Sequence, residues 1–255
     1  MDSIDKGILK ILLKDARMPQ RRIALLLGIS PPAVSYRMER LFGDVIKRFV
    51  LYVNPNFLGR YHAYVSFSNL HEWNGDYIAK IECLEDINVY EIDAKNRIEI
   101  EDKINKMTER LGEPRMVYIP NQMPYSPSKF DLKLISILKE KPLLKPIELA
   151  EELGVSSKTI RRHLRYLFNK NFIRLIPIID LNKAELVIFA VFTSQTESAK
   201  KIFSKYLFKE VEDERAGIYV NVVDSMDEAR DIILKFKREY DNNAEVMIVT
   251  RYEFL

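Results

Sequence analysis

The chain is built from two copies of one unit. When the sequence is aligned with itself at an offset of 126 residues, about 60 residues of each half match without a gap. Twice this offset is nearly the full length of 255 residues, which predicts a tandem duplication. The match fades after Phe67 and Thr193, so the second part of each half has diverged further. The matched pairs include Asp5 with Asp131, Ile8 with Leu134, Ala24 with Ala150, Gly28 with Gly154, Ser30 with Ser156, Val34 with Ile160, Leu41 with Leu167, and Arg48 with Arg174.

Charge alternates along the chain in step with this repeat. Lys and Arg number 10 against 5 Asp and Glu in residues 1–58, and 12 against 6 in residues 126–183. Carboxylates exceed cations in 59–125 and in 184–255. Basic modules are the ones expected to face polyanions such as nucleic acid. The formal net charge of +3 excludes a histone-like polycation, and 47% hydrophobic residues exclude a disordered chain.

Several missing signals narrow the class of protein further. The single cysteine, Cys83, excludes an intramolecular disulfide framework and a Cys-rich zinc site. The first residues lack the pattern of a secretory signal, and no apolar run approaches the roughly 20 residues that span a bilayer. Neither a glycine-rich phosphate loop nor a Gly-x-Ser-x-Gly motif occurs. We therefore expect a cytoplasmic protein with no membrane partner, no metal and no cofactor.

The first basic module has the pattern of a winged helix-turn-helix. A helix with apolar residues at helical spacing is followed by a second over 20–27 that ends at Gly28, a residue without a Cβ penalty at positive φ. Ser30 is placed to cap a third helix, which has Pro31 at its first position, where its missing N–H costs nothing. Close crossing of the last two helices needs a small residue, a glycine corner and an aliphatic side chain. These are Ala24, Gly28 and Val34.

The second basic module repeats this pattern at the same spacing. Ala150, Gly154 and Ile160 take the three crossing positions, and Ser156 is the cap. Each third helix is followed by an extended stretch, 46–53 or 172–179, rich in β-branched and aromatic residues. We expect these stretches to form wing hairpins or strands leading out of the modules. Arg48 and Arg174 would then contact the phosphate backbone.

The third helices are the candidate DNA-reading elements. A helix in the major groove reads base edges with the side chains of its N-terminal half, while flanking cations hold phosphates. The second copy is the more cationic, so we expect it to bind DNA more strongly. The alternative is that these are solvated helix faces in modules that now bind only protein. The residues predicted to face outward are Pro32, Ala33, Ser35, Tyr36, Arg37 and Arg40 in the first copy, and Ser157, Lys158, Thr159, Arg161, Arg162 and Arg165 in the second.

The acidic modules are predicted to be small α+β domains of the ferredoxin-like order βαββαβ. In the first, we expect strands at 61–68, 87–92, 97–100 and 115–119, and helices at 75–82 and 101–111. In the second, we expect strands at 185–193, near Glu210, at 217–223 and at 245–250, and helices at 198–207 and 226–240. The linker between the halves lies at 123–128, where two prolines and two serines interrupt any regular element.

The helical part of the first half resembles the Lrp/AsnC (feast/famine) family of prokaryotic regulators. The resemblance implies a transcription regulator that binds double-stranded DNA, with the winged helix-turn-helix followed by a ferredoxin-like (RAM) effector and oligomerisation domain. The expected domains are 1–58 and 129–183 (helix-turn-helix) and 59–122 and 184–255 (effector). The residues that carry the resemblance are Ile4, Asp5, Ile8, Leu9, Leu12, Ala16, Arg17, Ala24, Leu27, Gly28, Ile29, Ser30, Val34, Arg37, Leu41, Ile46, Asn54, Pro55, Leu58 and Gly59.

The duplication departs from the family, whose usual member has one copy per chain and pairs as a homodimer. Two effector domains in one chain can pair with each other as a pseudo-dimer, and chains can also pair as a homodimer. The two reading helices then differ, so the preferred DNA site is asymmetric.

The effector site is the weakest part of the resemblance. Family members bind an amino acid near a Gly-x-(aromatic)-Asp strand. Here Gly217 and Tyr219 are kept, but Val220 stands where the acidic residue belongs. An amino-acid effector, another small ligand and no ligand all remain open.

An enzyme is the remaining alternative. The same two-module architecture resembles the siroheme decarboxylases, which would need a tetrapyrrole pocket with basic and histidine side chains. His62 and His71 are the candidates, whereas His163 stands next to the reading helix as a surface or phosphate-facing residue.

The charge asymmetry between the reading helices predicts a difference in DNA binding. We expect Arg161→Ala combined with Arg162→Ala to weaken binding well beyond Arg37→Ala, because more phosphate-facing charge is lost. Gel-shift titrations of both variants measure this. Equal effects would contradict the asymmetry.

Overall fold

Three helices form each basic module, and their ends lie where the sequence predicted. The computed structural model describes residues 1–69 and 71–255. In the first module, Ser30 Oγ accepts a hydrogen bond from Ala33 N at 3.3 Å, and Gly28 adopts φ +67°. In the second, Ser156 Oγ accepts from Thr159 N at 3.1 Å. The helices are α1 (Ser3–Lys14), α2 (Gln20–Leu27), α3 (Pro31–Leu41), α5 (Lys129–Glu140), α6 (Pro146–Leu153) and α7 (Ser157–Asn169).

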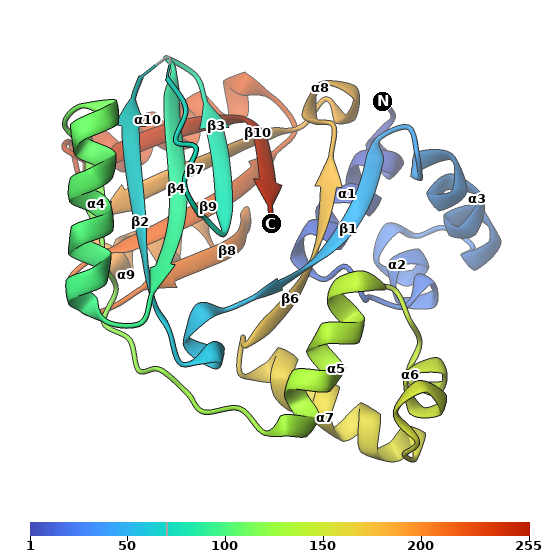
Figure 1. Cartoon of the computed structure of the whole chain (residues 1–255). Helices are drawn as coiled ribbons and strands as arrows, with labels where there is room; N and C mark the ends of the chain where they lie inside the picture. Colours follow the sequence, from blue (N-terminus) through green and yellow to red (C-terminus); the bar gives the residue numbers. More distant parts are fainter. Residues whose placement is uncertain (70) are drawn as a thin grey trace.

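The strands that leave the two modules pair with each other. β1 (Ile46–Val53) and β6 (Ile173–Ile179) form an antiparallel two-stranded ribbon in which Val50 lies opposite Ile176, its own equivalent in the repeat (Figure 1). A pseudo-twofold axis therefore passes between these two residues. The expected strands leading out of the modules are confirmed, whereas the alternative of wing hairpins is wrong, because each strand satisfies its backbone hydrogen bonds on its repeat partner.

The second effector domain has the predicted βαββαβ order. A short helix, α8 (Leu181–Ala184), leads into it. Its sheet order, β10-β7-β9-β8, is that of a ferredoxin-like unit. Its elements are β7 (Val187–Thr193), α9 (Thr196–Phe203), β8 (Leu207–Glu212), β9 (Gly217–Val223), α10 (Met226–Glu239) and β10 (Glu245–Phe254).

The first effector domain has the equivalent sheet order, β5-β2-β4-β3, but differs from prediction in two segments. The helix expected at 75–82 is wrong, because β3 pairs with both β4 and β10 in the middle of the sheet. The strand expected at 97–100 is instead the first turn of α4, since Asn96 Oδ1 accepts from Glu99 N at 2.9 Å and caps it. After the turn η1 (Pro55–Leu58), the elements are β2 (Tyr61–Ser68), β3 (Ala79–Cys83), β4 (Ile87–Ala94), α4 (Arg97–Leu111) and β5 (Met116–Tyr118).

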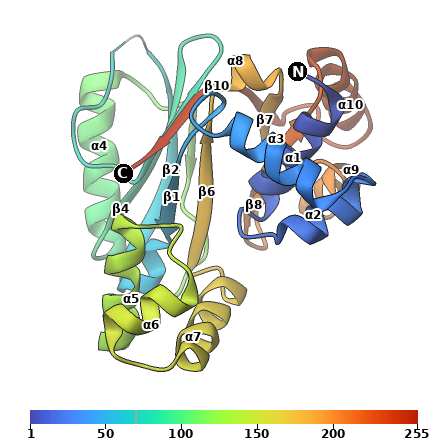
Figure 2. The same ribbon diagram turned by 90° about the vertical axis from the view of Figure 1, so that its right-hand side faces the viewer.

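The two effector domains join into one eight-stranded sheet. β3 of the first pairs antiparallel with β10 of the second, with Ile81 opposite Tyr252. At the other seam, Tyr118 Oη donates to Ala216 O at 2.9 Å, and Asn121 N donates to Asp213 Oδ2 at 2.7 Å. The sheet folds over, so that the two halves share a core between them. Figure 2 shows α4 outside one half and α9 and α10 outside the other. The halves thus form the expected intramolecular pseudo-dimer.

The two modules attach to this body differently. The core of the first module is continuous with the core between the sheet halves, and α1 packs on β6 and β8. The second module has its own core, which reaches the rest of the chain through Leu51 and Val53 of β1 and Phe57 of η1. The second module therefore stands out from the body (Figure 1).

Tyr252 fastens the ribbon to the eight-stranded sheet. Its buried hydroxyl donates to Pro177 O at 2.7 Å and accepts from Ile179 N at 3.2 Å. We expect Tyr252→Phe to lower the free energy of unfolding by about 1–3 kcal/mol, because two buried backbone groups lose their partner. Urea denaturation measures this. Tyr240→Phe, at an exposed position, is the control and should change stability by less than about 0.5 kcal/mol. A neutral Tyr252→Phe would show that the two bonds do not hold the ribbon.

Candidate nucleic-acid interface

The helix α7 presents one apolar face and one cationic face. Ile160, Leu164 and Leu167 are buried in the module core. The exposed face carries Lys158, Arg161, Arg162 and Arg165, as predicted. Ser157 and Thr159 are half-buried, and Thr159 Oγ1 lies 3.0 Å from the capping Ser156 Oγ. Four exposed cations within two turns of a helix that begins with a hydroxyl cap suit phosphate and base-edge contacts.

The helix α3 presents a weaker version of this face. Pro32, Tyr36 and Arg40 are exposed, and the Arg40 guanidinium lies 5.8 Å from the Tyr36 ring centroid. Ser35 and Ala33 are half-buried. Of the two arginines of α3 that were predicted to face outward, only Arg40 is therefore exposed.

Arg37 is occupied by an ion pair within its own module. Its Nη1 lies 2.5 Å from Asp2 Oδ2 and 2.7 Å from Asp5 Oδ1, and the hydrogen bond to Asp2, followed by that to Asp5, raises the pKa of Arg37. The prediction that Arg37 contacts DNA therefore competes with two carboxylates that already hold its guanidinium.

The second module has the equivalent contact between its third and first helices, with a histidine in place of the arginine. His163 occupies the position of Arg37, and its Nδ1 lies 2.7 Å from Oδ1 of Asp131, the equivalent of Asp5. His163 is half-buried against its own module rather than facing phosphate, so that part of the sequence prediction is wrong. The duplicated contact is structural in both modules.

The two strand arginines, Arg48 and Arg174, lie in different environments. Arg48 is exposed on β1. Arg174 points into the molecule, where its Nη2 donates to Leu13 O at 2.7 Å and to Phe208 O at 2.5 Å. Burial lowers the pKa of Arg174. The predicted phosphate contact of Arg174 is wrong, because β6 packs under α1 and β8 instead of forming a wing.

An open cavity of about 1000 Å³ adjoins the cationic face of α7. Its walls come from the α1–α2 turn, from α7, from β6 and β8, and from the start of the first effector domain. Arg17 of the α1–α2 turn lies 5.0 Å above the ring of Phe168 in α7, so the two modules meet at this wall. Its cationic lining residues are Lys14, Arg17, Arg161, Arg165, Arg174 and Lys209.

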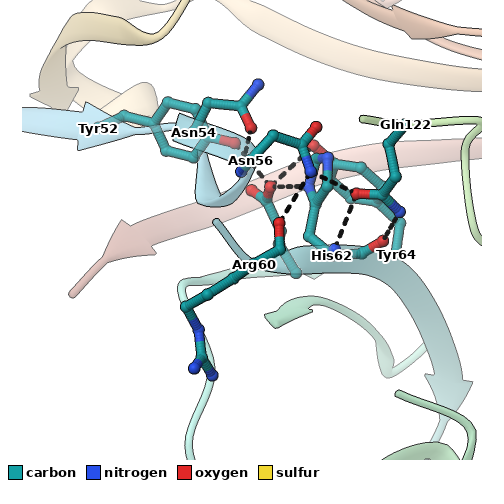
Figure 3. A network of polar contacts seen from close by, with 8 residues as sticks. Tyr52, Asn54, Asn56, Arg60, His62, Tyr64 and Gln122 are labelled. Atoms are coloured by element: carbon teal, nitrogen blue, oxygen red, sulfur yellow. Dashed lines mark hydrogen bonds and ion pairs between the residues drawn. The ribbon is translucent and has the colours of Figure 1, made fainter. Parts of the chain in front are cut away.

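Part of the lining of this cavity belongs to a buried polar cluster, which includes Tyr52, His62 and Tyr64. Figure 3 shows these three residues from close by. Glu91, fully buried on β4, accepts hydrogen bonds through Oε1 from Tyr52 Oη at 2.6 Å and from Tyr64 Oη at 3.0 Å. His62 Nδ1 lies 2.7 Å from the same oxygen. Lys209 Nζ lies 4.7 Å from the Tyr52 ring centroid and 5.7 Å from that of Tyr64. The cluster thus joins residues of β1, β2, β4 and β8.

Charge compensation sets the protonation of this cluster. Burial alone opposes ionisation of Glu91, but the positive charge of Lys209 and the hydrogen bonds from His62 and Tyr52 outweigh it and lower the pKa of Glu91 to about 2. Burial lowers the pKa of Lys209, and burial beside Glu91 raises the pKa of Tyr52 and of Tyr64 well above the usual value. Oε2 of Glu91 has no hydrogen-bond partner among the described residues.

Amide side chains hold the segment that precedes the linker against the same cluster. Gln122 accepts from His62 N at 2.9 Å and donates to His62 O at 2.8 Å. Asn56 Nδ2 donates to Gln122 Oε1 at 2.7 Å and to Arg60 O at 2.9 Å (Figure 3). These bonds fix the backbone of His62, so its ring is held at the cavity wall.

Sequence reasoning missed this cluster, although one signal was present. Ile87, Val89 and Glu91 alternate on one face of a strand, so a carboxylate follows two aliphatic residues at a core-facing position. A buried carboxylate requires compensating partners. Those partners come from three other strands, which the sequence alone does not place.

The predicted effector residues are not open to a ligand. Tyr219 is fully buried in the core of the second effector domain, and its hydroxyl donates to Glu212 Oε2 at 2.6 Å. Gly217 lies against Tyr219 and Glu212 so closely that a Cβ would stand 2.9 Å from either side chain. His71, the other tetrapyrrole candidate, is exposed and does not line the cavity.

Residues 1–69 and 71–255 contain no candidate membrane-spanning helix and no candidate metal site. No helix there is both long and apolar enough to span a membrane. No group of three or more His, Cys, Asp or Glu in those ranges is arranged to hold a metal ion.

Comparison with known proteins identifies the two helical modules. Residues 1–41 match the AsnC-type helix-turn-helix domain family, and residues 127–174 match a winged helix-turn-helix DNA-binding family. The chain therefore contains two helix-turn-helix domains of a DNA-binding class, and the resemblance to the AsnC type is confirmed for the first of them.

Individual relatives are transcriptional regulators with helix-turn-helix domains. The HTH-type transcriptional regulator FL11 of Pyrococcus furiosus is 42% identical over 60 residues, which are 23% of this chain and 40% of that protein. FL11 of Pyrococcus horikoshii is 28% identical over 123 residues, which are 44% of this chain and 80% of that protein. The chain thus spans less than half of the first relative.

A solved structure aligns with nearly the whole chain. The siroheme decarboxylase NirDL aligns over 98% of this chain and 92% of its own, at 16% identity and a TM-score of 0.46. At that TM-score nothing about activity follows from the likeness.

The Glu91 cluster predicts a pH-dependent stability. Because the folded pKa of Glu91 lies below its ordinary value of 4.5, its ionisation stabilises the fold above about pH 4.5, and this contribution is lost as the pH falls towards 2. We expect the free energy of unfolding of Glu91→Gln, measured in urea, to fall less steeply over this range than that of the native protein.

Glu91→Gln also leaves Lys209 without its charge partner and should destabilise the protein by about 3–5 kcal/mol at neutral pH. The double variant with Lys209→Met controls for this and should recover part of the loss. An unchanged acid slope in Glu91→Gln would show that Glu91 is not the group that titrates.

Proposed function

We propose that the protein is a sequence-specific transcription regulator that binds double-stranded DNA chiefly through α7 of its second module. The observation that carries this proposal is the exposed row of Lys158, Arg161, Arg162 and Arg165 on a helix-turn-helix reading helix. Such cations neutralise phosphates and release counterions, which supplies most of the affinity. The regulators among the relatives support the same assignment.

The two modules contribute unequally to this function. α3 offers Tyr36 and Arg40, whereas Arg37 is held by Asp2 and Asp5. The pseudo-twofold arrangement of one chain brings two different reading helices to DNA, so the operator is asymmetric, with half-sites spaced by about one helical turn or a multiple of it. The effector domains serve as the body that holds both modules.

The test is a gel-shift titration with the DNA upstream of the protein's own gene, repeated at several salt concentrations. We expect binding at tens of nanomolar or better that survives competitor DNA and falls steeply with salt, in line with roughly one counterion per phosphate contact. Arg165→Gln should weaken binding to all sequences and lower the salt slope by about one.

Arg110→Gln, on α4 away from the modules, is the matched control and should leave both quantities unchanged. No binding at low salt would overturn the proposal and leave a ligand-sensing interaction protein as the alternative.

A second candidate, a tetrapyrrole-binding enzyme, is favoured by the cavity alone. Its volume of about 1000 Å³, its six cations and the wall position of His62 suit a large polycarboxylate macrocycle. A visible-absorption titration with a porphyrin polycarboxylate separates this candidate from the first.

A further inference from the structure

We propose that the cavity beside α7 binds a small organic polyanion, and that this ligand and DNA compete for Arg161 and Arg165. The competition with DNA rests on the proposed DNA-binding function. The ligand site is inferred from the cavity alone, independently of DNA binding.

The cavity is built for negative charge. Six cationic side chains line it, of which Lys209 is already paired with Glu91, against the carboxylates of Asp15, Glu210 and Glu212. One of these carboxylates is already compensated, because Glu212 pairs with Lys200 and accepts from Tyr219. The lining is therefore left with a surplus of positive charge that a polyanion would neutralise.

Part of that charge is held away from water. Arg174 is fixed by two backbone carbonyls, and burial lowers the pKa of Arg174. Burial also lowers the pKa of Arg17, which is half-buried. Desolvated cations that are not matched by equal numbers of carboxylates favour an anionic ligand, because each gains more from it than an exposed cation would.

The lining also offers surface for the body of an organic molecule. The rings of Tyr52, Tyr64, Phe168 and Phe208 line the same space. The volume matches that of pockets that enclose a whole organic ligand. The chemical class is thus an aromatic or other apolar body that bears two or more carboxylate or phosphate groups.

The geometry couples this site to DNA binding. Arg161 and Arg165 belong to the exposed cationic face of α7 and also line the cavity, whereas Lys158 and Arg162 belong only to the exposed face. Arg17 belongs only to the cavity. A polyanion that bridges Arg17 to the two shared arginines occupies charges that DNA phosphates would otherwise contact. By linkage, DNA and ligand must then weaken each other's binding equally.

The experiment uses the full-length protein and two probes, pyromellitate (an aromatic tetracarboxylate) and tripolyphosphate, measured by isothermal titration calorimetry without DNA. We expect saturable binding of at least one probe. Arg17→Gln and Arg161→Gln should each weaken it roughly tenfold, as expected for the loss of a charge-assisted bond. Lys158→Gln should leave it unchanged. Preference for one probe distinguishes a carboxylate ligand from a phosphate ligand.

Competition is then measured by fluorescence anisotropy with labelled operator DNA at constant ionic strength. The probe should weaken DNA binding of the native protein, and Arg17→Gln should remove this effect while binding DNA as the native protein does. Lys158→Gln should weaken DNA binding and keep the calorimetric signal.

Absence of probe binding by calorimetry, or binding that Arg17→Gln leaves intact, would overturn the ligand site. Probe binding with unchanged DNA affinity would overturn the competition. Failure of the native protein to bind any DNA would instead overturn the proposed function, while the calorimetric result on the cavity would still stand.

Discussion

The antiparallel pairing of the two halves along their pseudo-twofold axis determines the rest of the structure. Val50 lies opposite its own repeat equivalent, Ile176, and β3 hydrogen-bonds to β10, so strands that would be exposed edges in a single copy are paired within the chain. This pairing folds the eight-stranded sheet around a shared core, and the two modules lead into opposite ends of one ribbon.

The duplicated modules have since become unequal, and their contacts show how. The pair Arg37 with Asp5 is matched by His163 with Asp131, so the internal brace is retained while its cation differs. The first module merges with the core of the body, whereas the second keeps its own core and carries more exposed positive charge on its reading helix. Arg174, which has an exposed twin in Arg48, turns inward and becomes part of the cavity wall.

Much of the fold was predictable because its signals are local. Caps such as Ser30 and Ser156, and corners such as Gly28 and Gly154, fix helix ends by bonds within four residues, and the structure has these helices where the sequence placed them. Segment 79–83 was mispredicted as helix because its strand state depends on β4 and β10, and β10 lies more than 160 residues away. The Glu91 cluster could not be predicted for the same reason. Its partners Tyr52, His62 and Lys209 lie on three other strands, which come together only in the folded protein.

The central claim is that the second module is the main DNA-reading element. Hydrogen–deuterium exchange of the full-length protein with and without operator DNA tests it most directly, because both reading helices report in one experiment. We predict strong protection on DNA binding in α7 (Ser157–Asn169) and weaker protection in α3 (Pro31–Leu41). Protection confined to α3, with α7 unchanged, would contradict it.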